Sequence, residues 1–135
     1  MAEQFTHSLR VRWNECDPQG IVFNGNYLVY FDVVFNEMWH EAIAPWSEIV
    51  ARGVDTVLAA TSLTFRGSAR FEDDLEVRAR VDHVGTTSVI TGITIVRGEE
   101  VIVEGTLRHV LVSTSDWRKT ELPSWIRDGL ERFRA

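Results

Sequence analysis

The chain has 135 residues, of which 44% are hydrophobic and 25% are charged, and its formal net charge is −6. This composition is that of an ordinary globular domain, and it excludes a disordered chain or a collagen-like fibre. The acidic balance, with 14 basic against 20 acidic residues, argues against a non-specific nucleic-acid binder, which usually carries a basic excess.

The length predicts one domain, residues 1–135. Cys16 is the single cysteine, so an intrachain disulfide is impossible and a reducing compartment fits. The N-terminal residues lack the basic and apolar regions of a signal peptide, and no run reaches the ~18 apolar residues of a membrane span. We therefore expect a cytoplasmic protein with neither a membrane nor a nucleic acid as partner.

The chain begins with an alternating segment. Residues 5–13 place apolar and polar side chains on opposite parities, which predicts a strand. A polar loop follows over residues 14–20, where Pro18 and Gly20 mark a turn.

Residues 26–43 change to a helical period. Apolar side chains recur three and four residues apart and occupy much of the circumference, which predicts a long helix covered on several sides. Asn24 or Asn26 is the expected helix cap, and Pro45 lies just past the end.

The second half of the chain is rich in strand patterns. Four strands are predicted, at residues 54–66, 75–82, 89–95 and 101–111. A hairpin loop at 97–100 joins the last two, and a final amphipathic helix starts at Pro123. The order of strand, long helix and four strands in a meander predicts an α+β fold, with about five antiparallel strands wrapped around one helix. Its edge strand and outer face need a cover, which a dimer supplies.

The segment from Asp17 to Tyr27 is the most informative part of the chain. Asp17 lies seven residues before Asn24, at the start of the predicted helix. A helix N-terminus presents unpaired N–H groups that can hold a developing oxyanion. A carboxylate beside such donors can act as a base or a nucleophile on an activated acyl group. By itself, however, an Asp-Pro pair is also a common turn, and Asn24 is also a common helix cap.

The run Asp17-Pro18-Gln19-Gly20-Ile21-Val22-Phe23-Asn24-Gly25-Asn26-Tyr27, with the long helix after it, resembles the hotdog-fold thioesterases. It is most similar to the 4-hydroxybenzoyl-CoA thioesterase type. Residues 71–77 and Pro123 fit later family blocks, so that the resemblance spans roughly residues 9–125. It implies a hotdog fold with one long central helix, an acyl-CoA substrate, hydrolysis without a cofactor, and a homodimer or homotetramer.

The resemblance also implies which residues form the site. Asp17 matches the catalytic carboxylate, as base or nucleophile, and the backbone N–H near Asn24 matches the donor to the thioester carbonyl. Asp32 matches an acidic helix position that faces the acyl group in the 4-hydroxybenzoyl type. The other implied substrate-binding residues are Gly20, Phe23, Gly25, Tyr27 and Ser88.

Two departures from the family pattern leave the acyl group open between aromatic and short- or medium-chain. The segment of residues 85–88 aligns with a pair of arginines for the CoA phosphates, and only Ser88 fits there. Position 24 is Asn rather than an aromatic residue. Asp32 also lies in line with Asn36 and His40, which suits a solvent-exposed helix face.

Three alternatives to a thioesterase are a hotdog hydratase or dehydratase, a non-catalytic binding protein and a metal-dependent enzyme. A hotdog hydratase or dehydratase has a histidine near its loop aspartate, and none lies between His7 and His40. A non-catalytic acyl-CoA-binding sensor would add a DNA-binding segment, for which no residues are left over. The spacing of the histidines and Cys16 offers no ligand set, so no metal site is expected. Cys16 suits a small buried filler better than a nucleophile.

Overall fold

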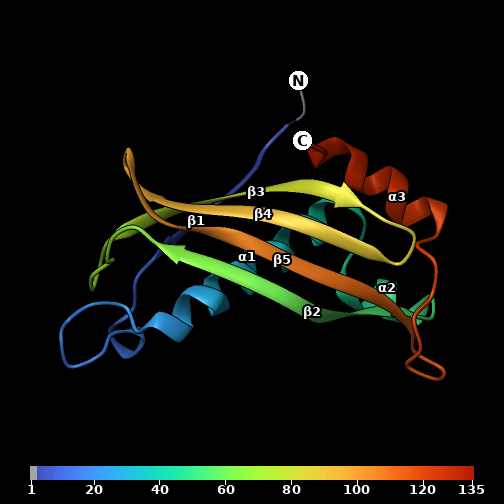
Figure 1. The fold of residues 1–135 in the computed structure, drawn as a ribbon, viewed down its shortest axis with the longest axis horizontal. Helices are drawn as coiled ribbons and strands as arrows, with labels where there is room; N and C mark the ends of the chain where they lie inside the picture. The colour runs from blue at the N-terminus through green and yellow to red at the C-terminus, as the bar shows by residue number, and fades with distance from the viewer. Residues whose placement is uncertain (1–2) are drawn as a thin grey trace.

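The computed structural model describes residues 3–135, in which one five-stranded antiparallel sheet curves around a long helix (Figure 1). The strands are β1 (Phe5–Arg10), β2 (Val54–Phe65), β3 (Asp74–Val84), β4 (Ser88–Arg97) and β5 (Glu100–Ser113). The helices are α1 (Asn24–Ala42), α2 (Trp46–Ala51) and α3 (Ser124–Leu130), with 3-10 turns η1 (Trp13–Glu15) and η2 (Glu131–Phe133). The predicted α+β class is confirmed.

The strand order across the sheet is β1-β3-β4-β5-β2. β3, β4 and β5 form the predicted meander, joined between β4 and β5 by the tight turn at Gly98. The prediction of a four-strand meander is wrong at β2, which pairs with β5 instead of β3. The connection over residues 66–73 therefore leads from the edge strand β2 past β5 and β4 to β3. Within it, the Ala69 carbonyl oxygen accepts a 2.9 Å hydrogen bond from the Val22 N–H.

Helix α1 lies in the concave face of the sheet and supplies much of the core (Figure 1). At 19 residues it is about 28 Å long. Its fully buried side chains are Tyr27, Tyr30, Phe31, Val34, Phe35, Met38 and Trp39. The predicted helical period is therefore confirmed, and Asp32, Asn36 and His40 form an exposed line along the same helix.

The start of α1 differs from the prediction. Phe23 is the N-cap, with extended backbone, and neither Asn24 nor Asn26 caps the helix. Both asparagines lie inside the first turn, and the Asn26 Nδ2 donates a 2.8 Å hydrogen bond to the Glu15 carbonyl oxygen. The side chain that looked like a cap therefore joins the helix to the segment before the loop.

The first strand is shorter than predicted because of a charged contact. β1 ends at Arg10, and residues 13–15 form η1 instead of extending the strand. The Arg12 N–H donates a 2.7 Å hydrogen bond to Oε1 of Glu15, which curls the backbone into the 3-10 turn. Helix α2, directly after Pro45, was also missed by the sequence pattern.

The last predicted helix is confirmed as α3, with Pro123 as its N-cap. The predicted stripe is buried and consists of Ile126 and Leu130 of α3 and Phe133 of η2. The Phe133 ring packs edge-on against Phe5 with centroids 5.5 Å apart. Neither α1 nor any other helix within residues 3–135 combines the length and the apolar character that crossing a bilayer requires.

Candidate active site

Asp17 lies in a closed turn between η1 and α1. Its backbone carbonyl accepts a 2.9 Å hydrogen bond from the Gly20 N–H, and its Oδ1 accepts one of 2.8 Å from the Gln19 N–H. Asp17 N–H in turn donates to the Ile21 carbonyl oxygen at 2.9 Å. These bonds form the turn that an Asp-Pro pair favours. They use one carboxylate oxygen, and within residues 3–135 no protein donor reaches Oδ2.

Gly20 allows that turn to close. Its φ is +79°, in the left-handed region, and a Cβ there would meet no atom within 4 Å. The glycine is therefore required for backbone conformation and not for space.

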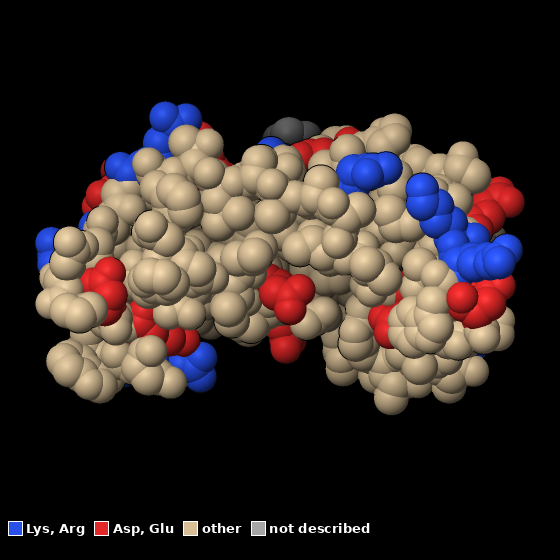
Figure 2. Space-filling model, turned by 60° about the horizontal axis from the view of Figure 1, so that its bottom comes forward, with Lys and Arg blue, Asp and Glu red and all other residues tan. Residues whose placement is uncertain are grey.

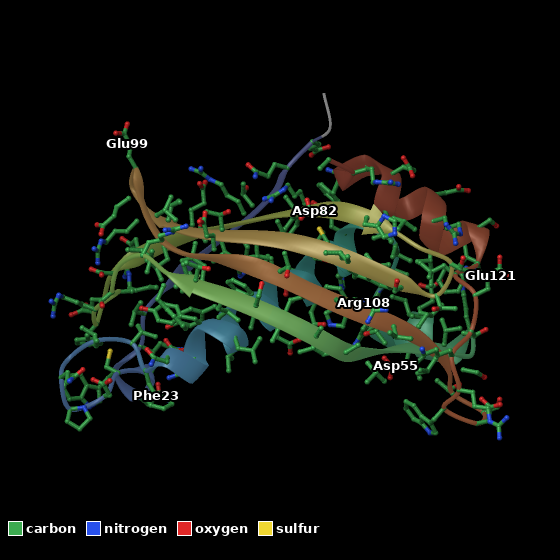
Figure 3. All side chains as sticks on the ribbon, viewed as in Figure 1. Phe23, Asp55, Asp82, Glu99, Arg108 and Glu121 are labelled. Atoms are coloured by element: carbon green, nitrogen blue, oxygen red, sulfur yellow. The ribbon has the colours of Figure 1, made fainter. Side chains whose placement is uncertain are left out.

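The first turn of α1 presents two open amides next to this loop. Within residues 3–135, the N–H groups of Asn24 and Gly25 make no backbone hydrogen bond, and both residues are exposed. No acidic side chain occupies this first turn. The open amides and the positive end of the helix dipole therefore make this point able to hold an oxyanion. Phe23 lies at the same junction, below the start of α1 (Figure 3), with its side chain exposed.

An apolar groove runs from this helix end along α1 toward the edge strand. It has a volume of about 280 Å³ and is lined by Gly25, Leu28, Val29 and Asp32 of α1 and by Leu58 of β2. Asp32 is thus the single charged side chain in the lining of this groove. In the space-filling view of this side of the molecule, most of the surface between its two ends is uncharged (Figure 2).

Five of the predicted site residues lie in this loop or at the start of α1: Asp17 and Gly20 form the turn, Phe23 is the N-cap, and Asn24 and Gly25 begin the helix. Asp32 lies about two turns farther along the helix, in the groove.

The other two predicted residues lie elsewhere in the chain. Tyr27 is buried in the core, where its hydroxyl accepts a 3.0 Å hydrogen bond from the Ala69 N–H. Ser88 begins β4 beside the β3–β4 turn, at the end of the sheet opposite the Asp17 loop (Figure 1).

The sequence pattern missed a buried carboxylate two residues before Asp17. Glu15 is buried, and its side chain accepts hydrogen bonds from Arg12 and from the Tyr30 hydroxyl. Burial opposes ionisation of this carboxyl, but the bonds from Arg12 and Tyr30 outweigh it and lower the pKa below its ordinary value. In the sequence, Glu15 is an acidic residue in a polar stretch, and exposed loops show the same pattern.

Within residues 3–135, no three His, Cys, Asp or Glu side chains form a cluster that could hold a metal ion.

Comparison with known proteins gives a consistent family. The model of the thioesterase superfamily matches residues 19–104. The acyl-CoA thioester hydrolase YbgC of Escherichia coli is 23% identical over 123 residues, which cover 90% of this chain and 92% of that protein. A 4-hydroxybenzoyl-CoA thioesterase of a Pseudomonas species is 30% identical over 80 residues, 57% of each protein.

A solved structure extends the likeness to the whole fold. The hypothetical protein TT1821 of Thermus thermophilus is 27% identical, with a TM-score of 0.89 over 96% of this chain and 98% of that one. The family match covers more than half of the chain. The chain therefore belongs to the thioesterase superfamily and is a hydrolase of hotdog fold.

Proposed function

We propose that the protein hydrolyses the thioester of an acyl-CoA to the free acid and CoA, with Asp17 as general base or nucleophile. The observation that carries this proposal is the loop–helix junction. A carboxylate with one open oxygen precedes a helix whose first two N–H groups make no backbone hydrogen bond within residues 3–135. These N–H groups belong to Asn24 and Gly25, which are both exposed residues. The relative YbgC, named an acyl-CoA thioester hydrolase, supports the same substrate class over nearly its full length.

The chemistry that this arrangement supports is acyl transfer. The carbonyl oxygen of the thioester accepts hydrogen bonds from the open amides, which stabilise the negative charge that develops on it. Asp17 either removes a proton from the attacking water or attacks the carbonyl carbon itself to form an anhydride that water then opens. In both routes the carbon–sulfur bond breaks, CoA leaves as the thiolate and takes up a proton, and the acyl group gains the hydroxyl of water.

For the acyl group, the groove supports a hydroxylated aryl ring. Leu28, Val29 and Leu58 supply apolar walls for the ring, and Asp32 is placed among them as a hydrogen-bond acceptor for a phenolic hydroxyl. A plain alkyl chain in the same groove would take water from the carboxylate without replacing its hydrogen bonds, which is costly. The Pseudomonas relative, which is named for 4-hydroxybenzoyl-CoA, supports this choice.

We also propose that the working form is a homodimer paired through β2. This strand has a β5 neighbour on one side only, and Val57, Leu58 and Phe65 on it are exposed. An edge strand of 12 residues offers the backbone groups of its open side to a second copy. Antiparallel pairing of two β2 strands would bring the partner's β3–β4 turn, with Ser88, toward the Asp17 loop. A site between two subunits would thus bring together Ser88 and the Asp17 loop, which lie at opposite ends of the sheet within one subunit.

The test is thiol release from a panel of acyl-CoAs, comparing the wild type with Asp17→Asn. Asparagine also forms this type of turn, so the change removes the charge and keeps the loop. We expect kcat to fall by roughly 10²–10⁴-fold on the best substrate. Asp116→Asn is the matched control, because Asp116 Oδ1 accepts the Arg118 N–H at 3.0 Å in a similar turn.

The assay also separates the proposed function from its rivals. An Asp17→Asn variant with nearly wild-type kcat contradicts the catalytic role of Asp17. The absence of thiol release from every acyl-CoA would instead favour a binding protein or a hydratase.

A further inference from the structure

We propose that Glu15 is the positioning residue of this site, holding the Asp17 loop in register with the N-terminal turn of α1. This inference rests on the proposed function of Asp17. Hydrogen bonds that the side chain and the backbone carbonyl of Glu15 accept join it to both sides of the loop.

The side chain of Glu15 is tied to residues on either side of it in the chain. Oε2 accepts from Arg12 Nε at 3.0 Å and from Arg12 Nη2 at 2.6 Å, so that the ion pair carries two hydrogen bonds on one oxygen. Oε1 accepts from the Arg12 N–H at 2.7 Å and from the Tyr30 hydroxyl at 2.8 Å. Tyr30 lies in the second turn of α1 and is buried, so its bond connects the carboxylate directly to the helix.

The backbone of Glu15 reaches the same helix at its first turn. Its carbonyl oxygen accepts from the Phe23 N–H at 3.0 Å and from Asn26 Nδ2 at 2.8 Å. Phe23 is the residue directly before the open amides of Asn24 and Gly25. Glu15 therefore contacts the helix at three residues, and Asp17 follows it by only two positions in the chain.

The charge states of Glu15 and Tyr30 favour a single, fixed arrangement of their hydrogen bonds. Tyr30 is buried beside the Glu15 carboxylate, and both burial and that bond raise the pKa of the phenol well above its ordinary value. Tyr30 therefore stays a neutral donor while Glu15 stays an anion at neutral pH. An ionised acceptor makes the stronger hydrogen bonds, and a buried one is costly to leave unpaired, so the network holds one arrangement.

The consequence concerns the reacting geometry. Acyl transfer requires the Asp17 carboxylate and the α1 amides to meet one thioester carbon from two sides. A displacement of about 1 Å in such a pair can lower the rate by about 10²-fold. Glu15 is not among the residues that line the groove proposed for the acyl group. It lines a separate hollow with Tyr30 and Val29. Its loss should therefore alter the chemical step more than substrate binding.

The experiment measures kcat and KM for Glu15→Gln and Tyr30→Phe, each alone and each combined with Asp17→Asn. Glutamine keeps the size of the side chain and loses the ion pair, and phenylalanine removes only the hydroxyl that bonds Oε1. We expect each single variant to lower kcat about ten-fold or more with KM within about three-fold, following the cost of misplacement. In the Asp17→Asn background the same changes should have no further effect, because a residue that acts through Asp17 has nothing left to position.

Glu48→Gln is the matched control, since Glu48 is an exposed carboxylate of α2 that accepts a 3.0 Å hydrogen bond from Arg52, the residue directly after this helix. Its kcat should equal that of the wild type. If Glu15→Gln does not fold, as judged by circular dichroism, Tyr30→Phe decides alone.

Two results would overturn the inference. One is wild-type kcat in Tyr30→Phe and in folded Glu15→Gln, with Asp17→Asn inactive, which leaves the proposed function standing. The other is an equal proportional loss with and without the Asp17→Asn change, which marks a purely structural role. Substantial activity in Asp17→Asn itself would instead contradict the proposed function.

Discussion

The rings of Phe35 and His109 stack face to face, with centroids 3.8 Å apart and an angle of 11° between their planes. The contact joins α1 to β5 in the middle of the core. His109 is buried, and within residues 3–135 its Nδ1 has no hydrogen-bond partner. Burial lowers the pKa of His109 from its ordinary 6.5 to about 4. The folded protein therefore holds this imidazole neutral at neutral pH.

This neutral histidine should make the fold sensitive to acid. Between pH 6.5 and pH 4 the unfolded chain binds a proton at His109 and the folded chain does not, so the free energy of unfolding falls as the pH is lowered. At pH 4 the loss from this group is about 3 kcal/mol. The measurement is urea denaturation at pH 7, 5 and 4 for the wild type and for His109→Phe, which keeps a ring beside Phe35 and cannot be protonated.

The variant should lose less stability than the wild type over this range by about that amount. His83→Phe, a change at an exposed histidine of β3, is the control for removing a histidine. Parallel pH curves for the wild type and His109→Phe would show that His109 is protonated equally well in both states.

Asp32 should decide which acyl groups the groove prefers. For a phenolic substrate, Asp32→Ala removes a hydrogen bond to a charged acceptor, worth about 1.5–3 kcal/mol or roughly 10–100-fold in kcat/KM. For hexanoyl-CoA it removes an unpaired carboxylate from an apolar groove, so kcat/KM should stay level or rise. The measurement is the ratio of kcat/KM for 4-hydroxybenzoyl-CoA to that for hexanoyl-CoA.

Asn36→Ala is the matched control for this ratio, because Asn36 is exposed one turn farther along the same line of α1. It should leave the preference unchanged. An unaltered ratio in Asp32→Ala would show that the carboxylate does not meet the acyl group.

The edge of β2 should hold two copies together. Val57→Asp places a charge on the exposed edge strand, where pairing would remove its water. We expect the wild type to sediment as a dimer or a larger assembly at assay concentration and Val57→Asp as a monomer with little activity. Val50→Asp, at an exposed valine of α2, should change neither property. A fully active monomer in either protein would contradict a site shared between subunits.

The sequence by itself determined the long helix, most of the strands and the family. The alternation in β3 and the helical period of α1 each report which side of an element is buried, and both are confirmed. The loop after η1 could be assigned a chemical role because Asp17, Gly20 and Asn24 lie within eight consecutive residues. Such patterns can be recognised from the sequence because they depend only on residues that are close together in the chain.

Only the tertiary structure decided which residues the buried face of each helix or strand contacts. Glu15 and Tyr30 are 15 positions apart, and Tyr27 and Ala69 are 42 apart, so no local pattern reports either hydrogen bond. The position of β2 at the sheet edge likewise depends on its long-range pairing with β5. A hydrophobic period shows that a residue is buried but not against which partner. The sequence could therefore point to Asp17. The role proposed for Glu15 depends on its hydrogen bond to Tyr30, which forms only when α1 packs against the segment before the loop.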